Sequence, residues 1–149
     1  VYMAFRRFLP TLIVYFVIHF WAGLDTDLTI LWLIPVLAMT ILFATGLANL
    51  LATLQVYFRD TANFLPYVVR IWLYLSPVLL TVDQVREKFH GLHPVNPLYS
   101  LLGSWGTVLD KAMAPSPALL AQAAAWSIGS FVVGSLVFMS RERDFAVRL

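Results

Sequence analysis

Hydrophobic residues fill four long runs along the chain, and polar residues gather in the shorter stretches between them. The runs cover residues 8–24, 28–58, 64–82 and 117–140. Each run falls within the range of about 17 to 25 residues that a helix needs to cross the hydrocarbon core of a bilayer, or exceeds it. We therefore predict an all-α integral membrane protein with a single transmembrane domain, residues 1–149, that contains four spanning helices.

The second run is longer than a bilayer core of about 30 Å requires. It contains no charged residue, and it is too short for two spanning helices and a turn. A single long helix can tilt or extend beyond the core. We expect residues 50–58 either to project into the cytosol or to belong to a tilted helix.

The stretch 83–113 separates the third and fourth runs and is partly apolar. Within it, Pro94, Pro97, Gly103 and Gly106 are expected to break a single helix. A fifth crossing would also place the arginine-rich end of the chain outside. We predict one or two short re-entrant or interfacial helices on the outer side. Irregular backbone at this depth is tolerated where protein or a water-filled cavity covers it, which favours a nearby pathway.

Basic residues indicate the orientation in the membrane, because cytoplasmic loops are enriched in lysine and arginine. One side of the predicted membrane carries Arg6, Arg7, Arg59, Arg141, Arg143 and Arg148, and the other carries Arg86, Lys88 and Lys111. Both ends of this chain are therefore predicted to be cytosolic. The link 25–27 then lies outside, flanked by Trp21 and Trp32 at the depth where indole rings anchor to the interface.

Composition agrees with a membrane protein. Hydrophobic residues make up 60% of the chain and charged residues 12%, whereas soluble domains contain about 25% charged residues. The net charge of +2 does not indicate nucleic-acid binding, because the basic residues sit at the ends of apolar runs. The chain has no cysteine, which excludes disulfides and cysteine-based metal sites.

The sequence contains no arrangement typical of catalysis. It has no glycine-rich P-loop, so ATP-driven work requires a partner. His90 and His93 lack nearby acidic ligands and are interpreted as residues of a solvated loop rather than a metal site. His19 and Asp25 are too far apart for the His-Asp motif of some acyltransferases, and we expect His19 to face a neighbouring helix. We therefore predict that the chain is not an enzyme and that it holds no cofactor.

Small residues recur along two of the predicted spans. They are Ala44, Ala48 and Ala52 in the second span, and Ala123, Ser127, Ser130 and Gly134 in the fourth. Small side chains let the backbones of membrane helices approach closely. We expect these two faces to pack in a bundle or dimer whose remaining helices come from elsewhere.

The short charged turn Arg59–Asp60 between the second and third spans allows two interpretations. Arg59 can anchor the cytosolic interface while Asp60 caps the next helix with its side chain. Alternatively, the turn contacts a cytosolic partner.

Arg70 lies inside the third apolar run and also allows two interpretations. In a helix, Tyr67, Arg70 or Ile71, and Tyr74 share one face. The guanidinium can extend back to the cytosolic interface. Alternatively, it faces an entry cavity and binds phosphate in a bidentate manner. Both interpretations stay open at this point.

Several short motifs, taken in order, resemble the membrane subunits of type-2 ABC exporters, in particular the permeases that export O-antigen, teichoic acid and other lipid-linked polysaccharides. These motifs are Tyr57-Phe58-Arg59-Asp60, Leu65-Pro66, Ser76-Pro77, Asn96-Pro97-Leu98 and the charged end from Arg141 to Phe145. Such permeases have six spans, and this chain is similar to the last four.

The resemblance implies a bacterial plasma-membrane permease that forms a homodimer and joins two ATPase subunits, which bind ATP and Mg²⁺. Its substrate would be a lipid-linked glycan, and the outer gate helices of the family would correspond to the region around 92–109. Five aromatic residues can stack on sugar rings, or else serve as packing and interface residues. They are Tyr67, Trp72, Tyr74, Tyr99 and Trp105.

Three alternatives stay open. The first is a type-2 exporter of drugs or small lipids, which shares the fold. The second is an integral-membrane transferase, which needs convergent acidic or histidine residues that the sequence does not offer. The third is a structural or regulatory membrane protein without transport.

Overall fold

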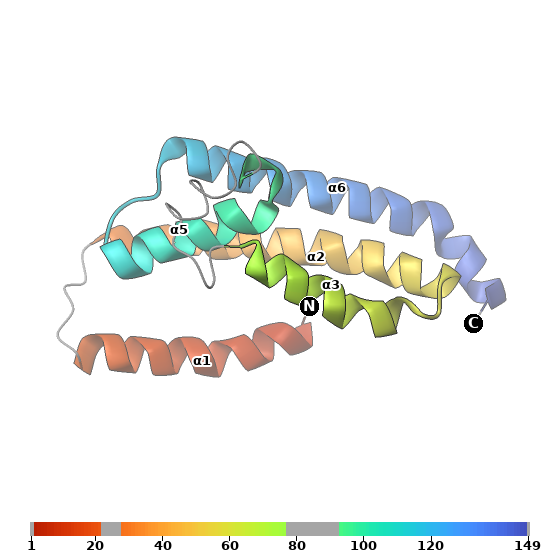
Figure 1. The fold of residues 1–149 in the computed structure, drawn as a ribbon, viewed down its shortest axis with the longest axis horizontal. Helices are drawn as coiled ribbons and strands as arrows, with labels where there is room; N and C mark the ends of the chain where they lie inside the picture. The colour runs from red at the N-terminus through yellow and green to blue at the C-terminus, as the bar shows by residue number, and fades with distance from the viewer. Residues whose placement is uncertain (1, 22–27, 77–92, 149) are drawn as a thin grey trace.

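The computed structural model describes residues 2–21, 28–76 and 93–148, and these residues form helices joined by short connections (Figure 1). The helices are α1 (Tyr2–Trp21), η1 (Leu28–Trp32), α2 (Leu33–Tyr57), α3 (Thr61–Tyr74), η2 (His93–Val95), α5 (Pro97–Lys111) and α6 (Pro117–Arg148). Within these ranges there is no strand, which confirms the all-α prediction.

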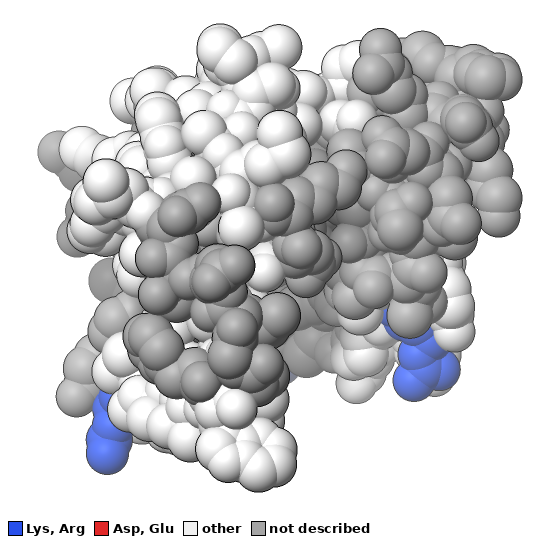
Figure 2. Space-filling model, turned by 90° about the vertical axis from the view of Figure 1, so that its left-hand side faces the viewer, with Lys and Arg blue, Asp and Glu red and all other residues white. Residues whose placement is uncertain are grey.

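Helices α2 and α6 lie side by side along the long axis of the molecule (Figure 1). Helix α3 flanks the half of α2 that ends at Tyr57, and α5 flanks the other half. Helix α1 lies at the edge of the bundle. The end of the molecule at which α1 and α5 finish shows basic groups only at its lower margin among the described residues (Figure 2).

Two helical segments of the described residues are long and apolar enough to cross a membrane. They are Leu28–Tyr57, with 30 residues, and Pro117–Arg141, with 25 residues. Their apolar side chains point largely outwards: Ile34 is 67% exposed and Leu136 is 61% exposed. A soluble core helix buries such side chains, whereas a membrane helix presents them to lipid or to neighbouring helices.

The other two predicted spans stay predictions. Helix α1 has 20 residues and does not meet the same measure of length and hydropathy. Helix α3 has 14 residues, and residues 77–82 of its predicted span lie outside the described part of the chain.

The tightest contact joins α2 to α6. A Cβ atom on Gly46 would collide with the backbone of Ser130, and one on Gly134 would collide with the carbonyl oxygen of Gly46. Two polar contacts cross the same seam: Asn49 Nδ2 donates to Ser135 Oγ (3.4 Å), and Ser130 Oγ donates to the carbonyl of Phe43 (3.3 Å). Helix backbones can approach this closely because these positions carry small side chains.

The small-residue prediction is confirmed for α6, and for α2 it stays a prediction. Ala123 and Ser127 are fully buried on α6. On α2, however, Ala44 and Ala52 are exposed, and the buried face carries Gly46 instead. The four-residue alanine repeat follows one helical stripe, but the seam with α6 lies along another.

Helix α5 begins where α3 ends, and both helices run toward the same end of the molecule (Figure 1). Pro94 lies in η2, and Pro97 occupies the first turn of α5. The prediction that Gly103 and Gly106 break the helix is wrong, because both lie inside α5. A glycine costs a helix only about 1 kcal/mol, and the packing of α5 against α2 and α6 overrides that cost.

Asp60 occupies the N-cap position of α3, but its side chain makes no capping hydrogen bond, which corrects the expectation for this residue. Its backbone has φ −76° and ψ −5°, in the helical region. A side-chain cap typically requires an extended N-cap residue. The turn is held instead by Gln55 Nε2, which donates to the carbonyl of Arg59 (2.9 Å), and by Thr61 Oγ1, which donates to that of Phe58 (2.6 Å).

Candidate functional site

An aromatic groove of about 680 Å³ lies between α2, α3 and α6, next to the start of α5. Aromatic and aliphatic side chains form most of its wall, among them Phe43, Trp72, Trp126, Leu47, Leu50 and Val133. Phe43 is near the middle of the long helical segment 28–57, so the groove opens at mid-length of the bundle.

Trp72 reaches the groove from α3. Its indole meets the ring of Phe43 edge to face, with ring centroids 6.3 Å apart and planes at 70°. The indole Nε1 donates to Oδ1 of Asn96 (2.9 Å). The nitrogen of Trp72 is therefore satisfied by protein, while part of its surface lines the groove.

Trp126 reaches the groove from α6, and its indole nitrogen is also bonded to protein. Its Nε1 donates to the carbonyl of Pro94 (3.0 Å), and the same carbonyl accepts from Nε2 of Gln122 (2.6 Å). Gln122 and Trp126 are four residues apart, so they share one face of α6. Both donors are thus bonded to Pro94 rather than directed at an occupant of the groove.

The polar donors around the groove are thus used within the protein. Ser130 Oγ also donates internally, to the carbonyl of Phe43. A ligand meets mainly ring faces and aliphatic walls. This arrangement suits a ligand that offers apolar faces of its own, and among the described lining residues no group is placed for bond breaking.

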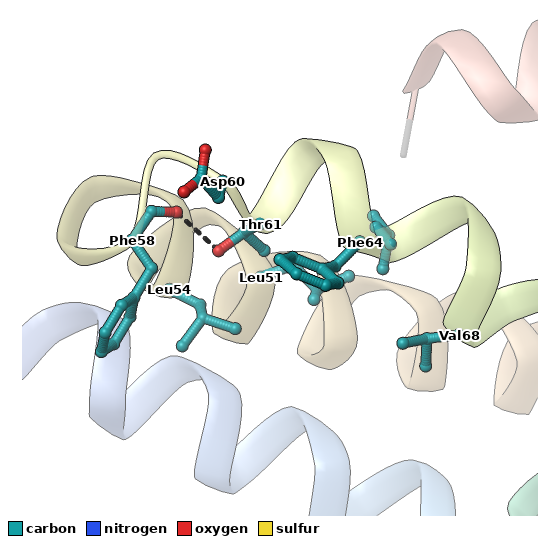
Figure 3. Close-up of a pocket in the computed structure, with 8 residues that line it drawn as sticks. Leu51, Leu54, Phe58, Asp60, Thr61, Phe64 and Val68 are labelled. Atoms are coloured by element: carbon teal, nitrogen blue, oxygen red, sulfur yellow. Dashed lines mark hydrogen bonds between the residues drawn. The ribbon is translucent and has the colours of Figure 1, made fainter.

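A second groove, of about 490 Å³, lies between α2 and α3 beside the charged turn (Figure 3). Leu51, Leu54, Phe64 and Val68 form most of its wall, with Phe58 at one end. Asp60 and Thr61 supply the polar groups at the turn. This groove is apolar along most of its length, and its described lining residues form no grouping typical of catalysis.

The structure brings one of the five predicted aromatic residues, Trp72, into the aromatic groove. Trp105 instead packs inside the bundle: its Nε1 donates to Thr40 Oγ1 (3.1 Å), and its ring meets Phe8 with centroids 6.0 Å apart. Tyr99 is buried on α5, with 6% of its surface exposed.

The remaining predicted residues lie on the outer surface of α3 and at its start. Tyr67 and Tyr74 are 66% and 61% exposed, and Arg70 is exposed on the same face. Helix α3 begins at Thr61, so Arg70 is about 14 Å along the helix at 1.5 Å per residue. Arg59 and Asp60 are exposed in the turn.

Sequence reasoning missed Asn96, Gln122 and Trp126 as parts of this site. Gln122 and Trp126 carried a usable signal, because an amide and an indole four residues apart interrupt an otherwise apolar span. Asn96 was recognised as part of a motif, but its partners come from a helix more than twenty positions earlier.

Metal binding finds no support in the residues that the structure describes, since no group of three or more potential ligands occurs among them. His19 is buried on α1 and its ring stacks on Tyr15, with centroids 5.7 Å apart. The pair His90 and His93 lies outside the described side chains.

Comparison with known proteins identifies the family of this chain. The sequence profile of the ABC-2 type transporter family matches residues 1–105. The chain belongs to the ABC-2 type transporter family. The resemblance seen in its motifs is thereby confirmed, and the exposed apolar helices α2 and α6 are those of an integral membrane protein of this family.

Relatives of this ABC-2 chain include O-antigen export system permease proteins RfbA. The protein from Klebsiella pneumoniae is 33% identical over 100 residues, which cover 66% of this chain and 39% of the relative. The protein from Myxococcus xanthus is 27% identical over 117 residues, which cover 76% of this chain and 45% of the relative. The chain thus spans less than half the length of these relatives. No solved structure matches it.

Proposed function

We propose that this chain is part of the permease of an ATP-driven exporter that moves lipid-linked polysaccharide from the cytosol across the bacterial plasma membrane. The observation that carries the proposal is the aromatic groove, in which Trp72 and Trp126 from two different helices line one space. The export of O-antigen by relatives of the same family supports the class of substrate.

The groove fits a glycan for a physical reason. A pyranose ring has faces made of C–H groups, and an indole offers an electron-rich π face that attracts such groups. The indole nitrogens of Trp72 and Trp126 are already bonded to protein. Recognition then depends on ring faces rather than on particular hydroxyls, which suits a polymer whose successive sugars pass one site.

The proposed exporter needs further components. This chain has no P-loop, so a separate ATPase subunit would bind ATP and Mg²⁺ and hydrolyse the ATP. A second permease copy would complete a homodimer. Exposed Ala44 and Ala52 on α2, and the exposed Tyr67 and Tyr74 on α3, supply surfaces on which such helices can pack.

Arg70 would contact the diphosphate of the lipid carrier. Its side chain is exposed on the face of α3 that also carries Tyr67 and Tyr74. A guanidinium group can bind phosphate in a bidentate manner.

The proposal is tested with the complete permease and its ATPase reconstituted in liposomes. We expect a polyprenyl-diphosphate-linked oligohexose to stimulate ATP hydrolysis and to be transported. Stimulation by small lipids or drugs, with no response to the linked oligohexose, would favour the alternative exporter. Absence of any ATPase partner would favour a role without transport.

Topology is tested by cysteine labelling, for which the chain has no native cysteine. Met113 is 60% exposed, in the connection between α5 and α6, and Arg59 is exposed in the turn between α2 and α3. We expect Met113→Cys to react with a membrane-impermeant reagent from outside and Arg59→Cys only from inside. The reverse pattern would overturn the cytosolic placement of both chain ends.

A further inference from the structure

The short segment of residues 94–96 accepts hydrogen bonds from both tryptophans that line the aromatic groove. Asn96 accepts the indole N–H of Trp72, and the carbonyl of Pro94 accepts that of Trp126. Trp72 belongs to α3 and Trp126 to α6, so the segment links two helices that are far apart in the sequence.

The side chain of Asn96 uses its full hydrogen-bonding capacity at this place. Its Oδ1 accepts from Nε1 of Trp72 (2.9 Å) and from the backbone N–H of Leu98 (3.1 Å). Its Nδ2 donates to the carbonyl of Leu75 (2.8 Å) and to Oγ of Ser76 (3.2 Å). An amide offers two donors and an oxygen with two lone pairs, so every position has a partner.

The Asn96-Pro97 sequence explains why the side chain can do this. A residue before proline is held in the extended region, and Asn96 has φ −87° and ψ 109°. That conformation turns its side chain toward the first turn of α5, where it caps the helix. The same Oδ1 that caps α5 also meets Trp72.

The neighbouring carbonyl completes the arrangement. Pro94 has no backbone N–H to donate, but its oxygen receives both Gln122 and Trp126. The two bonds join the segment to one face of α6, while Asn96 joins it to the end of α3. Displacement of the segment would release both indoles at once.

We propose that residues 94–96 are a positioning segment for the groove, and that Asn96 sets the ring of Trp72 for glycan binding. This inference rests on the proposed function. Asn96 itself need not touch the glycan: it fixes an indole nitrogen so that the ring face stays turned to the groove. The groove then keeps its shape only while residues 94–96 stay bonded to α3 and α6. Displacement of this segment would therefore also change the groove.

The experiment compares Asn96→Ser with Asn96→Asp in the complete permease and its ATPase. Serine, aspartate and asparagine are comparable N-caps, so α5 keeps a cap in both variants. Both variants lose the donors to Leu75 and Ser76. Aspartate also sets a charged oxygen against the carbonyl of Leu75. Only aspartate, however, keeps an oxygen that can reach Nε1 of Trp72, so a positioning role for this contact ranks aspartate above serine.

Binding is measured as the concentration of polyprenyl-diphosphate-linked oligohexose that gives half-maximal ATPase stimulation. For Asn96→Ser we expect this concentration to rise about tenfold, equivalent to about 1.4 kcal/mol, with the maximal stimulated rate little changed. Asn96→Asp is expected to lie between Asn96→Ser and the wild type. Equal values for the two variants, whether weak or unchanged, would overturn the positioning role.

Thr40→Val is the matched control. It removes the acceptor of another indole, that of Trp105, which lies outside the groove. We expect no change in half-maximal stimulation, and a rise equal to that of Asn96→Ser would show a general structural effect instead. If the wild-type complex does not respond to the linked oligohexose, the proposed function fails. If it responds but Asn96→Ser behaves like the wild type, only this inference fails.

Discussion

The two sides of α2 are built differently. Toward α6, the backbones meet at Gly46 and Gly134, and no space is left for a single added carbon. Toward α3, the contact includes the ring pair Phe43 and Trp72 and a groove of about 490 Å³. The groove of about 680 Å³ opens beside the seam, between Trp72 of α3 and the part of α6 that carries Trp126. One side of the helix is a closed seam, and the other carries space that a ligand can enter.

This difference assigns separate tasks to the two sides. Close-packed backbones tolerate little change in shape, because any added volume forces the main chain to move. The α3 side is held instead by side-chain bonds through Asn96 and Trp72, which a substrate or a moving segment can exchange. The seam of α2 with α6 should therefore tolerate less change in shape than the contact of α2 with α3.

The largest effect is expected for Gly46→Ala, which would disrupt the closed seam between α2 and α6. The new methyl group would meet the backbone of Ser130, which cannot turn away as a flexible side chain can. Overpacking typically costs about 1–3 kcal/mol, so we expect a clear fall in the thermal midpoint of the purified permease. An unchanged midpoint would show that the seam is looser than described.

Gly129→Ala is the matched control on α6, because nothing lies within 4 Å of the added Cβ. Replacing a helical glycine by alanine favours the helix by up to about 1 kcal/mol. The two alanine substitutions should therefore act in opposite directions. The same sign for both would contradict the contrast between the closed seam and the open side.

The open side is tested by Trp126→Leu, which keeps an apolar side chain and leaves Gln122 bonded to Pro94 but removes the ring face and the N–H of the indole. Aromatic contacts contribute about 0.5–1.5 kcal/mol beyond burial, so half-maximal stimulation by the linked oligohexose should require about 2- to 10-fold more ligand. Trp21→Leu is the control, because Trp21 is 89% exposed and far from the groove along the sequence. Equal effects of the two substitutions would argue against stacking in the groove.

Arg70→Ala examines the outer face of α3, where no groove residue lies. If Arg70 binds the diphosphate, we expect a roughly threefold weaker response to the lipid-linked oligohexose, since one exposed charged contact is worth less than about 1 kcal/mol. Arg70→Lys should recover little, because lysine lacks the bidentate geometry. Full recovery by lysine would support the anchoring role at the interface.

Much of the fold could be predicted from the sequence, because long apolar runs determine where helices form. The runs at 28–58 and 117–140 agree with the two helical segments that can span a membrane. The order of the motifs also led to the family that the sequence profile confirms. These features depend on local composition and on short stretches of consecutive residues.

The pairing of helix faces could not be predicted in the same way. The alanine stripe of α2 is as regular as the stripe that contacts α6. Only the position of α6 shows that the contact runs through Gly46. The aromatic residues posed the same problem. Trp72 and Trp105 both lie on short helices, yet Trp72 lines the groove and Trp105 packs against Phe8. Such distinctions depend on contacts between distant segments.

The smallest expected effect concerns the two helix starts beside α2, at Asp60 and Asn96. Asn96 has an extended backbone and caps α5, whereas Asp60 has a helical backbone and makes no capping bond. Loss of a working cap costs about 0.5–2 kcal/mol, but surface substitutions elsewhere stay within about 0.5 kcal/mol. Asp60→Ala should therefore leave the thermal midpoint nearly unchanged, while Asn96→Ala lowers it. A fall of similar size for Asp60→Ala would mean that its carboxylate caps α3 in the membrane-embedded protein. The turn beside the second groove would then be held more firmly than its backbone geometry indicates.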